Sequence, residues 1–143
     1  MALALFEAEA AAARGEVPVG AVIVADGALI ARAGNRTREL SDPSAHAELL
    51  AIRQAAERLG AERLTHADLY VTLEPCTMCA GAISLARLRR LYFGATDAKG
   101  GAVVSGVRFF SAPTCHHAPQ IYPGIGEQAA AALLKSFFRE RRV

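Results

Sequence analysis

The sequence carries little net charge and no long apolar segment. Its 143 residues have a formal net charge of +2, which is compatible with RNA binding but too small to argue for it. The longest uninterrupted apolar run spans residues 17–25 and is too short to cross a bilayer, so we expect no membrane anchor. Because Glu7 and Glu9 precede the first basic residue, we also expect that residues 1–13 are not a signal peptide.

Cysteine is equally scarce. The three cysteines are an odd number, and without a secretory start they indicate a reducing compartment, so we expect a cytoplasmic protein. There, a pair such as Cys76 and Cys79 is typical of metal binding or redox chemistry rather than of a disulfide. The chain also lacks internal repeats, low-complexity tracts and an interdomain linker. With 52% hydrophobic residues it can bury a core, which predicts one domain over residues 1–143.

Helical and extended patterns alternate along the chain. Apolar runs on either side of Asp26-Gly27 predict a β-hairpin, because Asp-Gly suits a tight turn. Later strands alternate with helices, which favours an α/β domain of three layers. The expected helices cover residues 2–14, 44–60 with Ser44 as the N-cap, 77–86 and 126–142; the expected strands cover 20–25, 29–33, 69–73, 89–94 and 120–122.

Three residues have the side chains of a catalytic zinc site. His46, Cys76 and Cys79 offer one imidazole and two thiolates, and both cysteines fall on the first turn of a predicted helix, where the dipole favours thiolates. Three protein ligands leave the fourth position of a tetrahedral Zn²⁺ open for water. Glu48 is not needed as a ligand, so it is free to move the water's proton. Since helical residues two apart point about 200° apart, His46 and Glu48 can face one metal only if the helix begins beside His46.

The same residues allow plainer interpretations. The two cysteines could be buried in an apolar helix or form a thioredoxin-like redox pair, although neither accounts for His46 and Glu48. In a non-catalytic zinc module, the segment Cys115-His116-His117 would supply a fourth ligand. Such a site would be closed and could not host water.

Two segments resemble the motifs of a known enzyme superfamily. His46-Ala47-Glu48 and the segment 73–83 (Leu-Glu-Pro-Cys-Thr-Met-Cys-Ala-Gly-Ala-Ile) resemble the zinc motifs of the cytidine/deoxycytidylate deaminases. Several shorter segments resemble its bacterial tRNA-specific adenosine deaminase branch. These are residues 16–22, 34–36, 93–95, 97–99 and 137–139.

The resemblance implies a fold, a metal and a reaction. It implies a three-layer α/β/α domain with a five-stranded mixed sheet, and a homodimer with one Zn²⁺ per subunit held by His46, Cys76 and Cys79. The substrate it implies is the wobble adenosine of a tRNA anticodon loop, and the product is inosine. Zinc hydroxide would attack C6 of the base, and Glu48 would pass the proton to the ring nitrogen and then to the departing ammonia.

The resemblance also implies substrate contacts. Asn35 would hydrogen-bond the target nucleoside, the Ala47 backbone would help to hold the base edge, and the loop with Asp97 and Lys99 would contact flanking nucleotides. Each has a plainer alternative: Asn35 could simply form a turn at a strand end, and the two loop residues could be solvated charges. Glu74 could support a metal ligand, but we expect a surface carboxylate.

The C-terminal third leaves a second substrate class open. The segment Cys115-His116-His117 departs from the branch, where an Asn-His pair is expected, so a deaminase of a free base or nucleoside (cytosine, guanine or cytidine) is the alternative. We expect the pair Phe137-Phe138 in the core, although aromatic residues beside cations can also bind single-stranded RNA. The neighbouring cations are Lys135, Arg139, Arg141 and Arg142.

Overall fold

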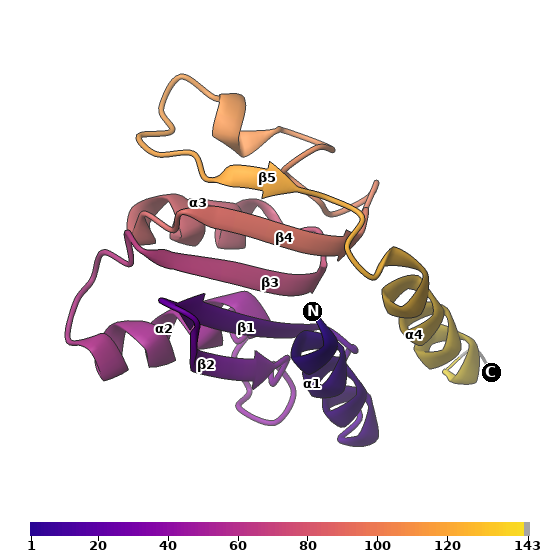
Figure 1. Ribbon diagram of the computed structural model, residues 1–143. Coiled ribbons are helices and arrows are strands. Elements are labelled where there is room, and N and C mark those ends of the chain that lie inside the picture. Colours follow the sequence, from indigo (N-terminus) through magenta and orange to yellow (C-terminus); the bar gives the residue numbers. More distant parts are fainter. Residues whose placement is uncertain (142–143) are drawn as a thin grey trace.

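The structure is a computed structural model that describes residues 1–141 (Figure 1). Within these residues lie four α-helices, five strands and one short 3-10 turn. In chain order the elements are α1 (Ala2–Ala13), β1 (Gly20–Ala25), β2 (Ala28–Gly34), α2 (Ala47–Leu59), β3 (Ala67–Leu73), α3 (Thr77–Ala86), β4 (Arg90–Ala95), η1 (Phe109–Ser111), β5 (Gln120–Tyr122) and α4 (Glu127–Glu140).

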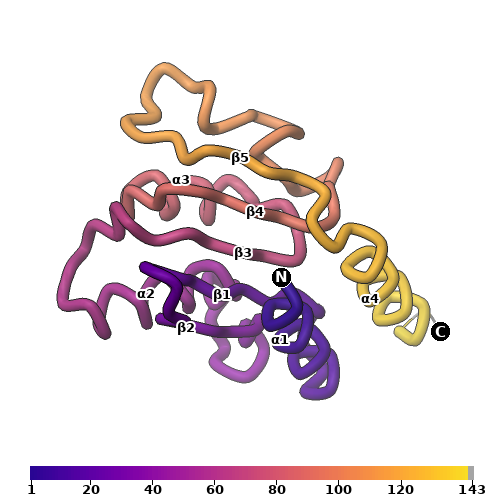
Figure 2. Tube along the Cα trace, in the orientation of Figure 1, coloured from indigo at the N-terminus to yellow at the C-terminus, as the bar shows by residue number. Residues whose placement is uncertain are grey.

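The five strands form one mixed sheet between two layers of helices. Their order is β2-β1-β3-β4-β5; β1 is antiparallel to β2 and β3, whereas β3, β4 and β5 are parallel. Helices α2 and α3 contact each other on one face, and α1 and α4 contact each other on the opposite face (Figures 1 and 2). The predicted three-layer α/β/α fold with a five-stranded mixed sheet is therefore confirmed.

The main core lies between the sheet and the layer of α2 and α3. Alternate residues of neighbouring strands point into it, as the two-residue period of a strand requires. On α2, small side chains at every fourth position face the strands, which lets the helix lie close to the sheet. These fully buried residues are Ala21, Ile23, Leu69, Val71, Leu91, Phe93, Ala47, Ala51 and Ala55.

Helix α2 begins directly after His46, as predicted, but not with the predicted cap. His46 is the N-cap in an extended conformation, with φ −73° and ψ 150°, so Ser44 as the N-cap was wrong. Ser44 instead donates hydrogen bonds from its N–H and hydroxyl to Oδ1 of Asp42. Asp side chains favour such local turns, and this one ends before the helix starts.

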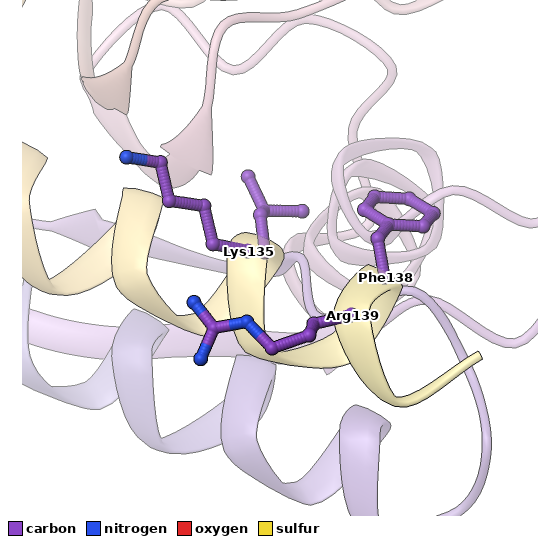
Figure 3. A pocket seen from close by; sticks show the side chains of 4 residues that line it. Lys135, Phe138 and Arg139 are labelled. Carbon is purple, nitrogen blue, oxygen red and sulfur yellow. The ribbon is translucent and has the colours of Figure 1, made fainter. Parts of the chain in front are cut away.

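Helix α4 separates the two phenylalanines that we expected in the core. Phe137 is buried under the Arg141 guanidinium, but Phe138 is 48% exposed, because consecutive helical residues point about 100° apart. Phe138 borders a surface hollow of about 310 Å³ with Lys135 and Arg139 (Figure 3). Arg142, predicted as the last helical residue, lies outside the described residues. Within residues 1–141, none of the helices combines the length and apolar character that crossing a bilayer requires.

The close packing of α1 on β1 gives a test of this architecture. A Cβ on Gly20 would lie 2.0 Å from the carbonyl oxygen of Ala4 and 2.6 Å from the nitrogen of Ala8, both backbone atoms of α1. Gly20→Ala should therefore lower the free energy of unfolding by about 1–3 kcal/mol, measured from urea denaturation. The matched control is Gly81→Ala in α3, where a Cβ meets nothing within 4 Å and helix propensity should improve. An unchanged midpoint for Gly20→Ala would contradict this packing.

Candidate metal centre and active site

The N-terminal ends of α2 and α3 lie close together beside the carboxyl end of β3. His46 is the N-cap of α2, Cys76 is the N-cap of α3, and Cys79 lies on the first turn of α3. Nδ1 of His46 lies 3.6 Å from Sγ of Cys76 and 3.6 Å from Sγ of Cys79. One ligand atom from each residue lies within 4.8 Å of the other two, so the fold brings the three predicted ligands together.

The three atoms fit a tetrahedral zinc ion. Ideal Zn–N and Zn–S bonds place nitrogen and sulfur ligands about 3.5 Å apart, close to the observed distances. Within residues 1–141, no fourth His, Cys, Asp or Glu joins the group. The segment Cys115-His116-His117 is engaged elsewhere: Cys115 Sγ donates to the carbonyl of His117, and His117 Nε2 donates to the carbonyl of Leu88. This donor set therefore has the composition of an open zinc site and not of a closed one.

The pKa values of the two cysteine thiols are shifted in opposite directions. The hydrogen bond from the Cys79 side chain lowers the pKa of Cys76 to about 4; burial acts in the opposite direction, and the His46 ring adds to the lowering. The same hydrogen bond, together with burial, raises the pKa of Cys79. The lowered pKa favours the thiolate form of Cys76 near neutral pH, and a cation bound by both sulfurs would displace the proton of Cys79.

Glu48 faces a cavity beside this cluster. Its side chain is 4% exposed, and it lines a cavity of about 280 Å³ together with His46 and Cys76. Burial raises the pKa of the Glu48 carboxyl, because the charged form loses its hydration. The rest of the lining is Val17, Val19, Asn35, Leu73, Glu74, Asp97 and Gly100.

Asn35 connects this cavity to the start of α2. Its Oδ1 accepts a hydrogen bond of 2.9 Å from the N–H of Ala47, the first residue of the helix. A first-turn N–H has no partner within its own helix, so Asn35 acts as a cap from a distant strand end. Asn35 therefore does more than form a turn, and the Ala47 N–H is already engaged.

A comparison with known protein families identifies the family of this chain. The model of the MafB19-like deaminases matches residues 1–142. The chain belongs to the MafB19-like deaminase family. The superfamily resemblance of its zinc motifs is thereby confirmed.

Individual relatives and solved structures are similar to nearly the whole chain. A protein of Agrobacterium fabrum named tRNA-specific adenosine deaminase is 67% identical over 143 residues, which cover 100% of this chain and 94% of the relative. A solved structure from studies of A-to-I editing by tRNA:A34 deaminases at the wobble position of transfer RNA is 68% identical, with a TM-score of 0.93 over 94% of this chain and 97% of that one. A guanine deaminase structure from Bacillus subtilis is 34% identical, with a TM-score of 0.65 over 96% and 88% of the two chains.

The two loop residues predicted to contact substrate differ in their positions. Asp97 lines the cavity, and its Oδ1 accepts the N–H groups of Lys99 and Gly100, so it shapes its own loop rather than being only a solvated charge. Lys99 is exposed and is not part of the cavity lining.

Glu74 organises the loop of this deaminase and is not on the surface. Its side chain is 2% exposed, so the expectation of a surface carboxylate was wrong. Oε1 accepts the Asp97 N–H and the Ser105 hydroxyl, and Oε2 accepts the N–H groups of Val103, Val104 and Ser105, at 2.9–3.0 Å. Burial raises the pKa of Glu74, but these hydrogen bonds outweigh it, so the pKa is lowered. A charged residue directly after an apolar strand was the signal that could have revealed this role.

Replacing the Glu74 carboxylate tests its hold on the loop. Glu74→Gln keeps the size of the side chain but presents an NH₂ group to backbone donors, so it should cost about 1–3 kcal/mol of stability. Amide hydrogen exchange in residues 97–105 should become faster, while exposed Glu62→Gln should change neither quantity. Because the pKa of Glu74 is lowered on folding, its contribution to stability is complete above about pH 4.5. This contribution is lost as the pH falls through the folded-state pKa. Unchanged amide hydrogen exchange in residues 97–105 would show that Glu74 does not hold this loop.

Proposed function

We propose that the chain hydrolyses adenosine to inosine at the wobble position of a tRNA anticodon. The observation that carries the proposal is the cluster of His46, Cys76 and Cys79, which faces a cavity shared with the buried carboxyl of Glu48. The similarity to proteins named tRNA-specific adenosine deaminase supports the choice of substrate. The match over residues 1–142 supports treating residues 1–143 as one deaminase domain.

The three clustered side chains would hold one Zn²⁺, with His46 binding through Nδ1 and the cysteines as thiolates. When bound, zinc supplies Lewis acidity that lowers the pKa of water toward neutrality. The position of His46 at the end of an extended segment aims its ring at the sulfurs, while Glu48, two residues later, still reaches the cavity. The fold thus resolves the helical spacing that would otherwise separate the two side chains.

Glu48 would move the protons of the reaction. Its carboxylate takes a proton from water as the water oxygen bonds to C6 of adenine, and passes that proton to the ring nitrogen. A second proton then reaches the exocyclic amine through Glu48, the C6–N bond breaks, and ammonia leaves. The atoms balance as adenosine plus water giving inosine plus ammonia. A buried carboxyl is suited to this work because it accepts and releases protons without bulk water.

The neighbouring polar groups would position the base. The Asn35 side-chain NH₂ makes no hydrogen bond within residues 1–141, so it is a free donor on the cavity wall. The Ala47 N–H could hold a base edge only by exchanging its bond to Asn35. Asp97 on the wall and Lys99 further out remain our candidates for flanking nucleotides. A cavity of about 280 Å³ lies just below the roughly 300–1,000 Å³ of drug-sized sites, which suits one base better than several.

The alternative substrate is a free base. The 34% identity to the guanine deaminase of Bacillus subtilis favours keeping it, since the metal ligands and the cavity alone do not distinguish a free base from a base in RNA. A tRNA substrate also supports our proposal that the protein works in the cytoplasm.

A parallel assay of two substrates tests the proposed function. The zinc-loaded protein should form inosine in an anticodon stem-loop with a wobble adenosine, and should release no ammonia from a mixture of free bases and nucleosides. Glu48→Gln should keep one zinc per chain but lose at least about a hundredfold in kcat, the scale of general acid–base catalysis. His46→Ala should lose zinc as well. Ammonia from the free mixture alone would replace the proposed substrate with the alternative, and full activity of Glu48→Gln would remove that residue from the mechanism.

We also propose that the chain forms a homodimer. Apolar side chains exposed on α3 and in the loop after β4 support an interface there, because apolar surface of this kind is typical of contact sites. Light scattering should give twice the 15.1 kDa of one chain, and Leu85→Glu should reduce that mass. The same change at Leu59 on α2 should not; a monomeric wild type would contradict the proposal. The exposed residues are Met78, Leu85, Val104 and Val107.

A further inference from the structure

A second pocket lies at the opposite end of the parallel strands from the metal cluster. It has a volume of about 460 Å³ and is lined by residues that lie just before β3, before β4 and at the start of β5. These amino ends are the left ends of the three strands in Figure 1. The cluster of His46, Cys76 and Cys79 lies at the carboxyl end of β3. The length of this strand therefore places the two sites roughly 20 Å apart. The pocket is therefore not an extension of the cavity beside Glu48. Its polar lining is Arg63, Thr65, Arg87, Arg89, His117 and Gln120.

The charge of this pocket is positive and incompletely balanced. Three arginines line it, and no carboxylate does so among the described residues. Arg89 has a counter-ion, because its guanidinium donates two hydrogen bonds to Asp68. Arg63 and Arg87 form no ion pair within residues 1–141. Two cations thus line a concave surface without a protein anion.

Arg87 is held in this wall by the backbone. It is the C-cap of α3 in the left-handed conformation, with φ 59°, a position that glycine normally occupies. Its Nε is buried and has no hydrogen-bond partner within residues 1–141, where it is the one such side-chain atom. A buried donor without a partner is rare in folded proteins, and an anion bound from outside the chain is one explanation for it. A planar guanidinium matches the paired oxygen atoms of a phosphate.

His117 and Ala118 line one side of the pocket. The His117 backbone N–H donates to Ser84 Oγ, and its Nε2–H donates to the Leu88 carbonyl, so the segment is fastened to the end of α3. The Cys115 thiol donates to the His117 carbonyl in the same arrangement. The His117 ring is thereby fixed beside Arg87 and Arg89 in the lining.

We propose that the pocket formed by Arg63, Arg87, Arg89 and His117 binds phosphate groups, at a site separate from the metal cluster. The phosphate could belong to the RNA backbone or to a small phosphorylated molecule, and both sources present the same oxygen atoms to the arginines. The proposal does not depend on the deaminase substrate.

The first experiment titrates the full chain with inorganic phosphate at constant ionic strength. The arginine Nε–H signals in nitrogen–proton correlation spectra should shift saturably for Arg87, and chloride should not reproduce the shift. Arg87→Gly should abolish saturable binding without loss of folding, because glycine suits the left-handed backbone at this position. Arg63→Gln gives a second variant that changes only an exposed side chain. A non-saturable drift, or identical binding by Arg87→Gly and wild type, would overturn the site.

The second experiment distinguishes the two sources of phosphate. If the pocket meets the RNA backbone outside the anticodon, Arg87→Gly should weaken binding of full-length tRNA several-fold and reduce the salt slope by about 0.7–0.9, while binding of an isolated anticodon stem-loop stays unchanged. If the ligand is a small molecule, tRNA binding should stay the same while phosphate binding is lost. The matched control is Arg53→Gln, an exposed arginine on α2 outside the pocket. No change in either ligand for Arg87→Gly would refute the proposal.

Discussion

The meeting of two helix N-termini is the constraint on which the rest of the structure depends. Helices α2 and α3 start from different strands, yet His46 Nδ1 lies 3.6 Å from both cysteine sulfurs. The alanine face of α2 allows that helix to approach the sheet, and the Asn35 side chain fixes its first N–H. Two positive helix ends also favour the thiolates that a cation would need. The sheet, the small core residues and the capping bond therefore all help to hold His46 close to the two cysteines.

Three buried glutamates, Glu16, Glu48 and Glu74, differ in the surroundings of their carboxyl groups. Glu74 accepts five hydrogen bonds from one loop, and Glu16 accepts the N–H groups of Arg38 and Glu39 in another. Burial alone would raise both pKa values, but the hydrogen bonds reverse the direction and keep these groups charged. At Glu48, burial outweighs a backbone hydrogen bond and the charge of His46, both of which lower the pKa, so the pKa of this carboxyl is raised. The same residue type thus anchors a loop at two positions, whereas at the third its raised pKa suits the proton transfer that we propose.

The sequence predicted the parts of the site that depend on local spacing. The pair Cys76–Cys79, the start of α2 beside His46 and the alternating core all follow from short-range patterns, and the sheet and layers agreed with them. What it missed depends on partners distant in the chain: Asn35 capping Ala47, or Glu74 holding residues 97–105. No periodicity encodes such contacts, and local turn chemistry misled the placement of the cap at Ser44.

The parallel strands explain why chemistry of opposite character gathers at the two ends of the sheet. At the carboxyl ends, strand-to-helix turns present cysteine and histidine, as is usual for α/β sheets. At the amino ends, the returning loops place Arg87 and Arg89 beside each other, and only Arg89 has Asp68 as a counter-ion. A purely structural role would be satisfied by glycine at Arg87, given its left-handed backbone. The left-handed backbone does not itself require a cation, so the Arg87 side chain is available for the phosphate that we propose.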